Sequence, residues 1–283
     1  MTKIIIHGGA GIGTDDATRK EISKAISDIA TRCWPTLIDA GARAATVHAV
    51  SLLEDNPLFN AGVGSKLQSD GVARMSASLM DGDRGRFSGV VNVTGLRNPI
   101  VLCRKLLEDK DRVLAGEGAD AKWRALGLEA LDVRTPRRIE EWKRKVSGST
   151  GTVGAIALDS AGNLAAATST GGRGFETVGR VSDTPTVAAN FATKFSAVTC
   201  TGIGEDIVEA GLAVKVATML DMGLSMSETA DRVLKDLNLA GCQAGYIALN
   251  AEGDWVHVST TEAFYWCCRS DGDERGFWDE PKS

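Results

Sequence analysis

Apolar positions recur with two different periods along the first third of the chain. A β-branched run at residues 3–7 (KIIIH) predicts a strand that continues into the glycine-rich stretch GGAGIG. Apolar residues then recur with helical spacing over residues 18–31 and again over 42–56, which predicts two amphipathic helices. The runs 73–80 and 87–94 are separated by Asp-Gly-Asp and predict an antiparallel hairpin.

The remainder of the chain mixes strands and helices in the same way. A helix is expected to open at Asn98-Pro99, and helical spacing returns over about 116–144. Residues 151–170 predict a β-hairpin built almost entirely of core residues. Two helices and two closing strands are expected near residues 205–221, 227–237, 243–249 and 254–259. Because strands and helices are grouped rather than strictly alternating, the pattern favours stacked sheets with helices outside them.

Composition and charge narrow the class of protein. The 283 residues are 43% hydrophobic and 24% charged, with a formal net charge of −5. Nucleic acid and anionic membranes attract basic surfaces, so neither is expected as a partner. The apolar run at residues 4–6 is too short for a signal peptide or a membrane span. The six cysteines lack CxxC spacing and are expected to be free thiols of a cytoplasmic protein. Residues 146–150 (VSGST) form the one linker-like stretch, within a single domain spanning 1–283.

Several familiar catalytic motifs do not occur in this sequence. It contains neither GxSxG nor HExxH, and its three histidines lack metal-ligand spacing, which argues against a zinc site. The glycines after the first strand are spaced G-x-G-x-G, with Thr14 where a dinucleotide fingerprint has glycine. A non-catalytic, nucleotide-binding α/β protein that uses GGAGIG therefore stays open as an alternative from another functional class.

The pair Gly151-Thr152 offers a nucleophile that needs no histidine. A threonine at a chain amino terminus carries a hydroxyl and a free α-amine, and this amine, with a pKa of about 7.7–8.0, accepts the hydroxyl proton. An internal threonine gains that amine only when the preceding bond is cut. Gly151 permits a strained turn, and Thr152 opens a buried strand that would hold it rigidly. A threonine after a glycine at the start of a strand is commonplace, so the pair alone decides nothing.

Three later segments supply groups that such a nucleophile requires. The hairpin ends in hydroxyl residues at 168–170. Arg180 and Asp183 are a cation and an anion three residues apart, a spacing that can grip a zwitterionic head group. Residues 201–204 place a hydroxyl and backbone N–H groups ahead of a helix, as an oxyanion hole requires. The simpler interpretations are a surface salt bridge and an ordinary helix N-terminus.

Short motifs over nearly the whole chain give these segments a context. In order they are HGGAG at 7–11, PLFNAGVG at 57–64, MDG at 80–82, LRNP at 96–99, GEGA at 116–119, GTVGAIALD at 151–159, ATSTGG at 167–172, GRVSD at 179–183 and CTGIGE at 200–205. This ordered set resembles the plant-type (type III) asparaginases and isoaspartyl peptidases, which are N-terminal-nucleophile (Ntn) hydrolases.

The resemblance implies a fold and an architecture. The fold would be α+β, a four-layer αββα Ntn-hydrolase sandwich with two stacked, mainly antiparallel sheets. The chain would cleave itself between Gly151 and Thr152 into an α subunit (1–151) and a β subunit (152–283). The assembly would be a homodimer of cleaved αβ units.

The resemblance also implies roles in the reaction for five residues. Thr152 would be the nucleophile and, through its amine, the base, while Thr170 would assist its hydroxyl. Thr201 and Gly202 would hold the oxyanion, and Asn60 would line the active site.

Binding of the substrate and of an ion is implied in the same way. Arg180 would bind the substrate α-carboxylate and Asp183 its α-amino group, with Gly204 completing the head-group site. No catalytic cofactor is implied. A structural sodium ion would be held by backbone carbonyls near Leu53, Phe59, Ala61 and Val63.

The implied reaction is hydrolysis of the β-amide of β-aspartyl (isoaspartyl) dipeptides, of L-asparagine or of both, which releases L-aspartate. The chain departs from the family pattern at residues 173–178 (RGFETV), where relatives usually show an Asn-Lys pair, at Ser182, which replaces a glycine, and over 186–199 and 242–245. The alternative within the fold is therefore a β-aspartyl amide with a different leaving amine. The second residue of a dipeptide is expected to touch the first and last of these segments, with Glu176 at the mouth favouring a basic residue.

Overall fold

Two β-sheets organise the chain in the computed structural model, which describes residues 1–11, 15–146 and 151–278. The larger sheet has eight strands in the order β12 (Asp273–Trp278), β11 (Ala263–Ser270), β1 (Lys3–Gly11), β5 (Val153–Leu158), β6 (Leu164–Thr170), β2 (Met75–Asp81), β3 (Arg86–Val93) and β4 (Val113–Ala115). The smaller sheet has the order β10 (Trp255–Ser259), β9 (Ala244–Asn250), β8 (Ser196–Gly202) and β7 (Asn190–Ala192). Neighbouring strands are antiparallel except β3 and β4.

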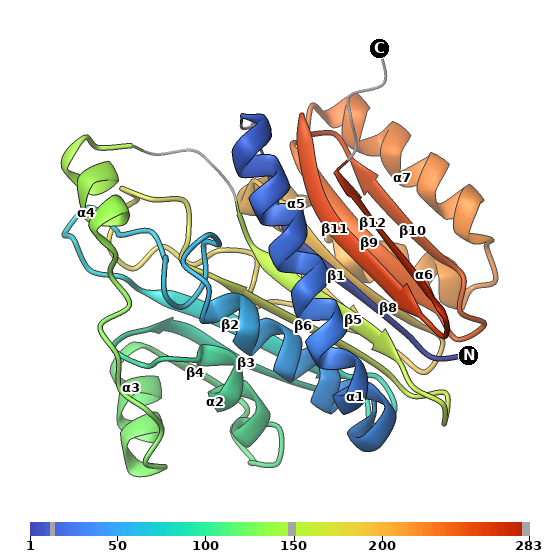
Figure 1. Cartoon of the computed structure of the whole chain (residues 1–283), viewed down its shortest axis with the longest axis horizontal. Helices are drawn as coiled ribbons and strands as arrows, with labels where there is room; N and C mark the ends of the chain where they lie inside the picture. Colours follow the sequence, from blue (N-terminus) through green and yellow to red (C-terminus); the bar gives the residue numbers. More distant parts are fainter. Residues whose placement is uncertain (12–14, 147–150, 279–283) are drawn as a thin grey trace.

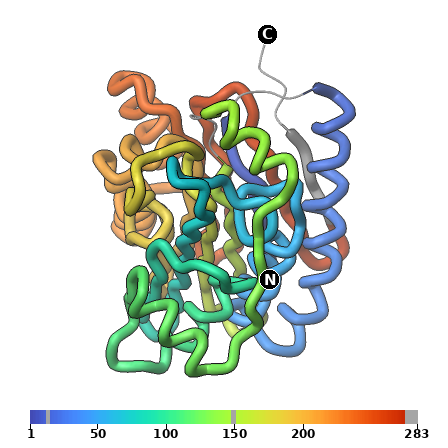
Figure 2. The backbone as a smooth tube through the Cα atoms, turned by 90° about the vertical axis from the view of Figure 1, so that its left-hand side faces the viewer, coloured from blue at the N-terminus to red at the C-terminus, as the bar shows by residue number. Residues whose placement is uncertain are grey.

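Helices cover the outer face of each sheet, so the molecule has four layers. The long helix α1 (Asp16–Glu54) and α2 (Pro99–Leu106) pack on the larger sheet (Figure 1). The smaller sheet is covered by α5 (Gly204–Ala210), α6 (Leu212–Asp221) and α7 (Met226–Ala240). Figure 2 shows the blue α1 on one side, the orange helices on the other and the strands between them. The predicted αββα sandwich is confirmed.

The burial of β1 explains why the two sheets stack. Ile4 and Ile6 belong to the apolar cluster beneath α1, whereas Ile5 belongs to the cluster between the sheets. Side chains of a strand alternate between its faces, and here both faces are covered, so all three isoleucines are fully buried. Burial of such a side chain stabilises the fold by about 1.5–3 kcal/mol relative to exposure.

Helix α1 joins the two helices that the periodicity predicts. They form one element, interrupted at Gly41, whose φ of 81° is not helical. Asp15 caps its first turn and accepts a hydrogen bond from the Thr18 amide at 2.9 Å. At the break, the Ala42 amide donates to the Asp159 carboxylate at 3.1 Å, so the second half has a cap from another segment. A long-range partner of this kind leaves no trace in local periodicity.

The hairpins β2–β3 and β5–β6 confirm the predicted pairs. The stretch expected to be helical over 116–144 instead divides into α3 (Gly116–Ala125) and α4 (Pro136–Lys143), because residues between them run as an extended segment that bridges back to Leu96. The prediction that the last strand lies near residues 254–259 is also wrong. After β10, strands β11 and β12 return to the larger sheet, where β11 pairs with β1.

The remaining expectations concern the linker, the cysteines and the membrane. Residues 147–150 of the linker and 12–14 of GGAGIG lie outside the described residues. All six cysteines are free. In the described part of the chain, no helix is long and apolar enough to cross a membrane.

Candidate active site

The ends of three strands meet where Thr152 begins the second half of the sequence. Val153 of β5 pairs with Ser169 of β6, which brings Thr152 and Thr170 to the same end of that hairpin. The last residue of β8, Gly202, reaches the same place from the smaller sheet. The predicted nucleophile therefore lies at the junction of the two sheets.

A small cavity of about 20 Å³ collects most of the predicted site residues. Its walls include Gly151, Thr152, Thr170, Arg180, Asp183, Gly202 and Gly204. A space of this size admits about one water molecule. An aspartyl head group is much larger, so it requires part of the wall to move, and Gly151 belongs to that wall.

Thr152 itself is almost fully buried, with 4% of its surface exposed. Its Oγ1 lies 3.4 Å from Oγ1 of Thr184, which is fully buried. The role of Thr184 escaped the sequence analysis, and the one signal that could have found it is its place directly after Asp183. A hydroxyl at this distance can orient the Thr152 hydroxyl without acting as a base.

His7 is the histidine nearest to the nucleophile. It pairs with Gly154 across β1 and β5, and a Cβ at Gly154 would lie 2.4 Å from its Nε2, so only glycine fits there. Burial lowers the pKa of His7 to about 3. The imidazole is therefore neutral at physiological pH.

Arg180, Asp183 and Gly204, the predicted head-group site, lie close together. A Cβ built on Gly204 would lie 2.9 Å from both Arg180 Nη2 and Asp183 Oδ1, so the two charged groups close on the bare face of this glycine. Asp183 is 2% exposed, and its Oδ2 has no hydrogen-bond partner among the described residues. Burial raises the pKa of this carboxyl to about 7. A buried acceptor without a partner is costly, and a substrate ammonium would supply one.

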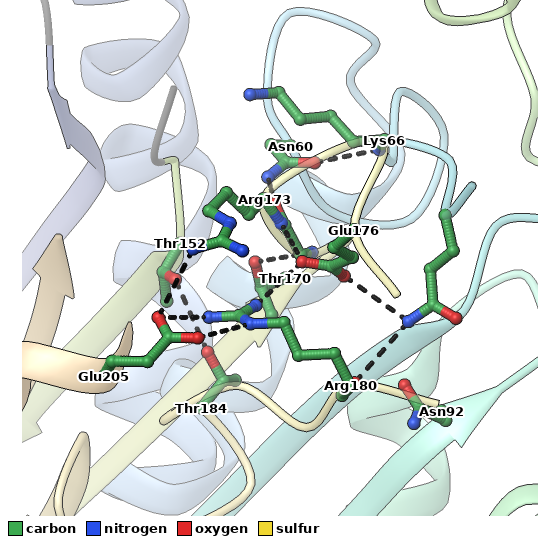
Figure 3. A network of polar contacts seen from close by, with 12 residues as sticks. Asn60, Lys66, Asn92, Thr152, Thr170, Arg173, Glu176, Arg180, Thr184 and Glu205 are labelled. Atoms are coloured by element: carbon green, nitrogen blue, oxygen red, sulfur yellow. Dashed lines mark hydrogen bonds and ion pairs between the residues drawn. The ribbon is translucent and has the colours of Figure 1, made fainter. Parts of the chain in front are cut away.

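Arg180 does not pair with Asp183, contrary to the simpler interpretation of a surface salt bridge. Two carboxylates hold its guanidinium: Glu205 accepts from Nε and Nη2, and Glu176 accepts from Nη1, all at 2.8 Å (Figure 3). The hydrogen bonds from Arg180 lower the pKa of Glu205 to about 2. Glu205 is about half exposed, so a substrate carboxylate can replace it on the guanidinium.

Thr201 and Gly202 end β8 beside the nucleophile. Thr201 is fully buried and its Oγ1 accepts a hydrogen bond from the Ala10 amide at 3.2 Å, which leaves its own proton available for donation. Gly202 has φ of 145°, and a Cβ there would lie 2.4 Å from the Gln243 carbonyl oxygen. The backbone behind Gly202 is thus packed too closely for any other residue.

Asn60 connects Gly151 to the loop that carries the lysine at position 66. Its Nδ2 donates to the Gly172 carbonyl at 2.6 Å, and its Oδ1 accepts from the Lys66 amide at 2.9 Å. On the other side of Gly151, Gly9 has φ of 115°, and a Cβ there would lie 2.8 Å from the Gly151 Cα. Gly151 is therefore clamped between β1 and Asn60.

Comparison with known proteins agrees with this geometry. A family model described as Asparaginase matches residues 1–276. The chain belongs to the asparaginase family. It is 41% identical over 277 residues to the isoaspartyl peptidase/L-asparaginase of Nostoc sp., covering 89% of this chain and 86% of that protein. It is 37% identical to the isoaspartyl peptidase of Escherichia coli, covering 93% and 91%, and 31% identical to the plant-type L-asparaginase of Thermococcus kodakarensis, covering 100% and 99%.

The family confirms the resemblance on which the sequence analysis relied, and these relatives are hydrolases. The structure gives no support to the alternative of a nucleotide-binding loop. Gly9, Ala10 and Gly11 lie within strand β1 and pair with β11 through Tyr265, Phe264 and Ala263. In this asparaginase-family chain Gly9 instead packs closely against Gly151, and Gly8 packs against Phe59 and Ile26.

The segment that departs from the family pattern at 173–178 has a different place from the one expected. Glu176 is 4% exposed and lies beneath Arg180, so it neither lines a mouth nor sits in solvent. Its carboxylate also accepts from the Arg173 amide at 2.9 Å and from Gln68 at 3.4 Å. The expected preference for a basic second residue therefore loses its basis, because this charge is committed to Arg180.

The other departures are placed as follows. Ser182 lines the small cavity, and its buried hydroxyl has no hydrogen-bond partner among the described residues. Within residues 186–199, Asn190 donates to Ser78 at 2.9 Å and links the two sheets. Residues 243–245 lie behind the oxyanion segment, where Gly245 pairs with Thr201, so they shape the oxyanion site from its rear.

The loop that follows α1 carries three of the four predicted sodium ligands, Phe59, Ala61 and Val63, whereas Leu53 lies at the end of α1. Two glycines fold it tightly: a Cβ at Gly62 would lie 2.2 Å from the Glu54 carbonyl oxygen, and one at Gly64 would lie 2.6 Å from that of Phe59 and 2.8 Å from that of Pro57. Carbonyl oxygens gathered in this way are ligands for a hard cation. Among the described residues, no group of three or more His, Cys, Asp or Glu could hold a metal.

Proposed function

We propose that this chain is a threonine amidohydrolase that cleaves itself between Gly151 and Thr152 and then hydrolyses the β-amide of β-aspartyl dipeptides and of L-asparagine, releasing L-aspartate. The observation that carries the proposal is the shared cavity. The hydroxyl of Thr152 and the head-group site of Arg180, Asp183 and Gly204 open onto one space. The names of the relatives, isoaspartyl peptidase and L-asparaginase, support the same substrates.

Self-cleavage is the first step. The Thr152 hydroxyl adds to the Gly151 carbonyl carbon, and the bond to the Thr152 nitrogen breaks as this nitrogen takes up a proton. Water then hydrolyses the resulting ester, which leaves a carboxylate on Gly151 and a free amine on Thr152. The clamp on Gly151 from Gly9 and Asn60 supports this step, because it restrains the residue whose carbonyl carbon is attacked.

The mature site would then act on the substrate. Asp183 binds its α-ammonium group and Arg180 its α-carboxylate, which places the side-chain amide at Thr152. The Thr152 amine accepts the hydroxyl proton as the oxygen attacks the amide carbon, and Thr170 donates to that oxygen. Thr201 and the backbone at Gly202 stabilise the oxyanion. The amine returns the proton to the leaving nitrogen, and water hydrolyses the acyl-enzyme.

Assembly, location and ion binding belong to the same proposal. Cleavage yields an α subunit of residues 1–151 and a β subunit of 152–283 within one domain, since strands β1 and β5 from the two parts pair in one sheet. The active unit would be a homodimer of αβ units in the cytoplasm, and the six free thiols support that location. A sodium ion held by the carbonyls near Leu53, Phe59, Ala61 and Val63 would stiffen the loop that carries Asn60.

The test is a time course of purified protein on denaturing gels and by intact mass, with release of aspartate from β-aspartyl-leucine and asparagine measured in parallel. We expect the 29.8 kDa chain to separate into two subunits as activity appears. Hydrolysis by a chain that stays intact would exclude the N-terminal mechanism. Two subunits without any release of aspartate would exclude the substrates.

A further inference from the structure

A second cavity, of about 190 Å³, lies beside Gly151. Gly151 contributes to the walls of both. The second cavity is also lined by the glycine-rich end of β1, by Asn60 and by three cationic side chains, Lys66, Arg137 and Arg138. The two spaces thus share the residue at which the chain would be cut.

The charge of this second cavity is positive. Lys66 and Arg138 are 5% and 7% exposed. Arg138 donates to the Gly64 carbonyl at 2.6 Å and to Glu141 at 2.7 Å, and Arg137 donates to the Pro57 carbonyl at 2.9 Å. Of the acids whose field acts on Lys66, Glu141 is bound to Arg138, and Glu176 is bound to Arg180. Three cations therefore line this cavity, and Glu141, which pairs with Arg138 and lies 3.9 Å from Arg137, is the one acid of these two that is bound within the group.

These cations occupy unfavourable positions for stability alone. Arg137 and Arg138 lie in the first turn of α4, which contains no acidic residue, although a helix N-terminus disfavours positive charge. Burial lowers the pKa of Lys66 to about 8, because its charged form loses hydration and stands near Arg138. Figure 3 shows its ammonium directed away from the Glu176–Arg180 network. The lining of this cavity therefore holds more positive charge than the local structure favours, and such a lining suits an anionic ligand.

The chemistry of the proposed reaction decides what this ligand is. The leaving nitrogen of a substrate takes its proton from the Thr152 amine and must therefore lie on the side of that nitrogen. The Thr152 nitrogen is the atom bonded to Gly151, and Gly151 lines both cavities. Whatever is attached to the leaving nitrogen extends over the place of Gly151 into the second cavity.

We propose that the second cavity binds the leaving amino acid of a β-aspartyl dipeptide, with Lys66 and Arg138 as partners of its α-carboxylate and Arg137 at the rim. The inference rests on the proposed function and names its leaving group. Ammonia from asparagine carries no carboxylate and gains nothing from these cations. A carboxylate bound there in both ground and transition state holds the scissile amide in line with Thr152.

One other carboxylate has the same chemistry, namely that of Gly151 after self-cleavage. If the cations bind this carboxylate of the protein, kcat/KM should not depend on whether the substrate has a terminal carboxylate. Substrates with and without a terminal carboxylate therefore separate the two sources.

The experiment compares kcat/KM for β-aspartyl-leucine, its C-terminal amide and asparagine, with protein first processed to completion by intact mass. Wild-type enzyme is expected to prefer the dipeptide acid to its amide by about tenfold or more, as loss of one buried charge partner implies. In Lys66→Met this acid-to-amide ratio should fall by about the same factor. The matched control is Lys24→Met, an exposed lysine of α1, which should keep the wild-type ratio.

A second variant covers the case in which Lys66→Met does not process or fold. Arg137 has a half-exposed side chain at the rim, so Arg137→Gln should lower the ratio less, by about threefold, while the fold is kept. Replacing the leucine by glutamate should raise kcat/KM, and replacing it by lysine should lower it, because the cavity is basic.

Equal kcat/KM of wild-type enzyme for the dipeptide acid and its amide would overturn the assignment of the second cavity to the leaving amino acid. The proposed function would stand in that case, because the chain would still cleave itself and hydrolyse both substrates. In that case, slower self-cleavage by Lys66→Met would assign the cations to the Gly151 carboxylate. A wild-type chain that neither cleaves itself nor hydrolyses any of the three substrates would instead refute the proposed function.

Discussion

Replacement of Gly204 by alanine tests the head-group site with a single methyl group. Gly204 is the first residue of α5, and its backbone conformation is open to any residue. Alanine therefore fits the helix and, by intrinsic propensity, would favour it by about 1 kcal/mol. The added Cβ would lie 2.9 Å from Arg180 Nη2, 2.9 Å from Asp183 Oδ1 and 3.3 Å from the Asp183 amide nitrogen.

These distances fix the expected size of the effect. Non-bonded atoms are at their best separation near 3.5–4.0 Å, so each charged group must retreat by about half an ångström or more. Asp183 is buried, and two carboxylates hold Arg180, so the retreat breaks their alignment toward a substrate. A hydrogen bond to a charged group contributes about 1.5–3 kcal/mol. Loss of the hydrogen bond from Arg180, of the one to Asp183, or of both is expected to lower kcat/KM by about 10-fold to 10⁴-fold.

The assay measures kcat/KM for asparagine and β-aspartyl-leucine, self-cleavage by intact mass and the thermal midpoint. The control is Gly118→Ala in α3, where an added Cβ meets no atom within 4 Å. Both variants should self-cleave, since the atoms nearest to a Cβ at Gly204 do not include Gly151. The reasoning fails if Gly204→Ala turns over both substrates within about twofold of wild type with an unchanged midpoint.

Four further outcomes are expected. Thr152→Ala should remain a full-length chain of 29.8 kDa by intact mass and be inactive, whereas Thr152→Ser should retain some processing; clean cleavage of the alanine variant would remove Thr152 from the mechanism. Arg180→Ala and Asp183→Ala should fold and largely self-cleave but lose about 2–5 kcal/mol of transition-state binding, and normal turnover of asparagine by both would contradict the clamp. β-Aspartyl dipeptides should exceed asparagine in kcat/KM, because the head group is the same and only the leaving residue adds contacts; a better rate with asparagine than with every dipeptide of a small panel would refute this. Burial raises the pKa of Asp183 to about 7, so its carboxyl is protonated below that pH and cannot pair with the substrate ammonium. We therefore expect kcat/KM to fall as the pH drops through about 7. The fall in kcat should be less steep, because a bound ammonium keeps the carboxylate charged and only the Thr152 amine titrates. Equal limbs in both parameters would exclude Asp183 as the group responsible.

The elements that local sequence could predict are those with local causes. The hairpins β2–β3 and β5–β6 have turns between alternating runs, and both formed as predicted. The order of the motifs also located the groups around Thr152: Thr170 and Gly202 end strands that the pattern marks, whereas Arg180 and Asp183 lie in the loop between β6 and β7. The αββα layers followed from the grouping of strands and helices together with the family resemblance.

What escaped prediction depends on contacts between distant segments. Strand β11 is defined by its pairing with β1 across the whole length of the sequence. Thr184 approaches the nucleophile only because the segment after Arg180 folds back over β5. Lys66 and Arg138 belong to separate stretches, and neither carries a motif. Spacing along the chain cannot reveal a cavity whose walls come from four elements.

The charges around the head-group site give the selectivity a physical reason. Arg180 lies between two carboxylates, Glu176 and Glu205, and Asp183 adds a third acid nearby. A second cation, Arg173, lies 3.9 Å from Glu205. An incoming anion therefore meets a negative field unless it takes the place of Glu205, the one exposed member of the set. An ammonium group on the ligand would then add a positive charge beside the buried carboxylate of Asp183. Glu176 is fixed below Arg180 and balances part of its charge, so we expect the site to favour a zwitterion over a simple carboxylic acid.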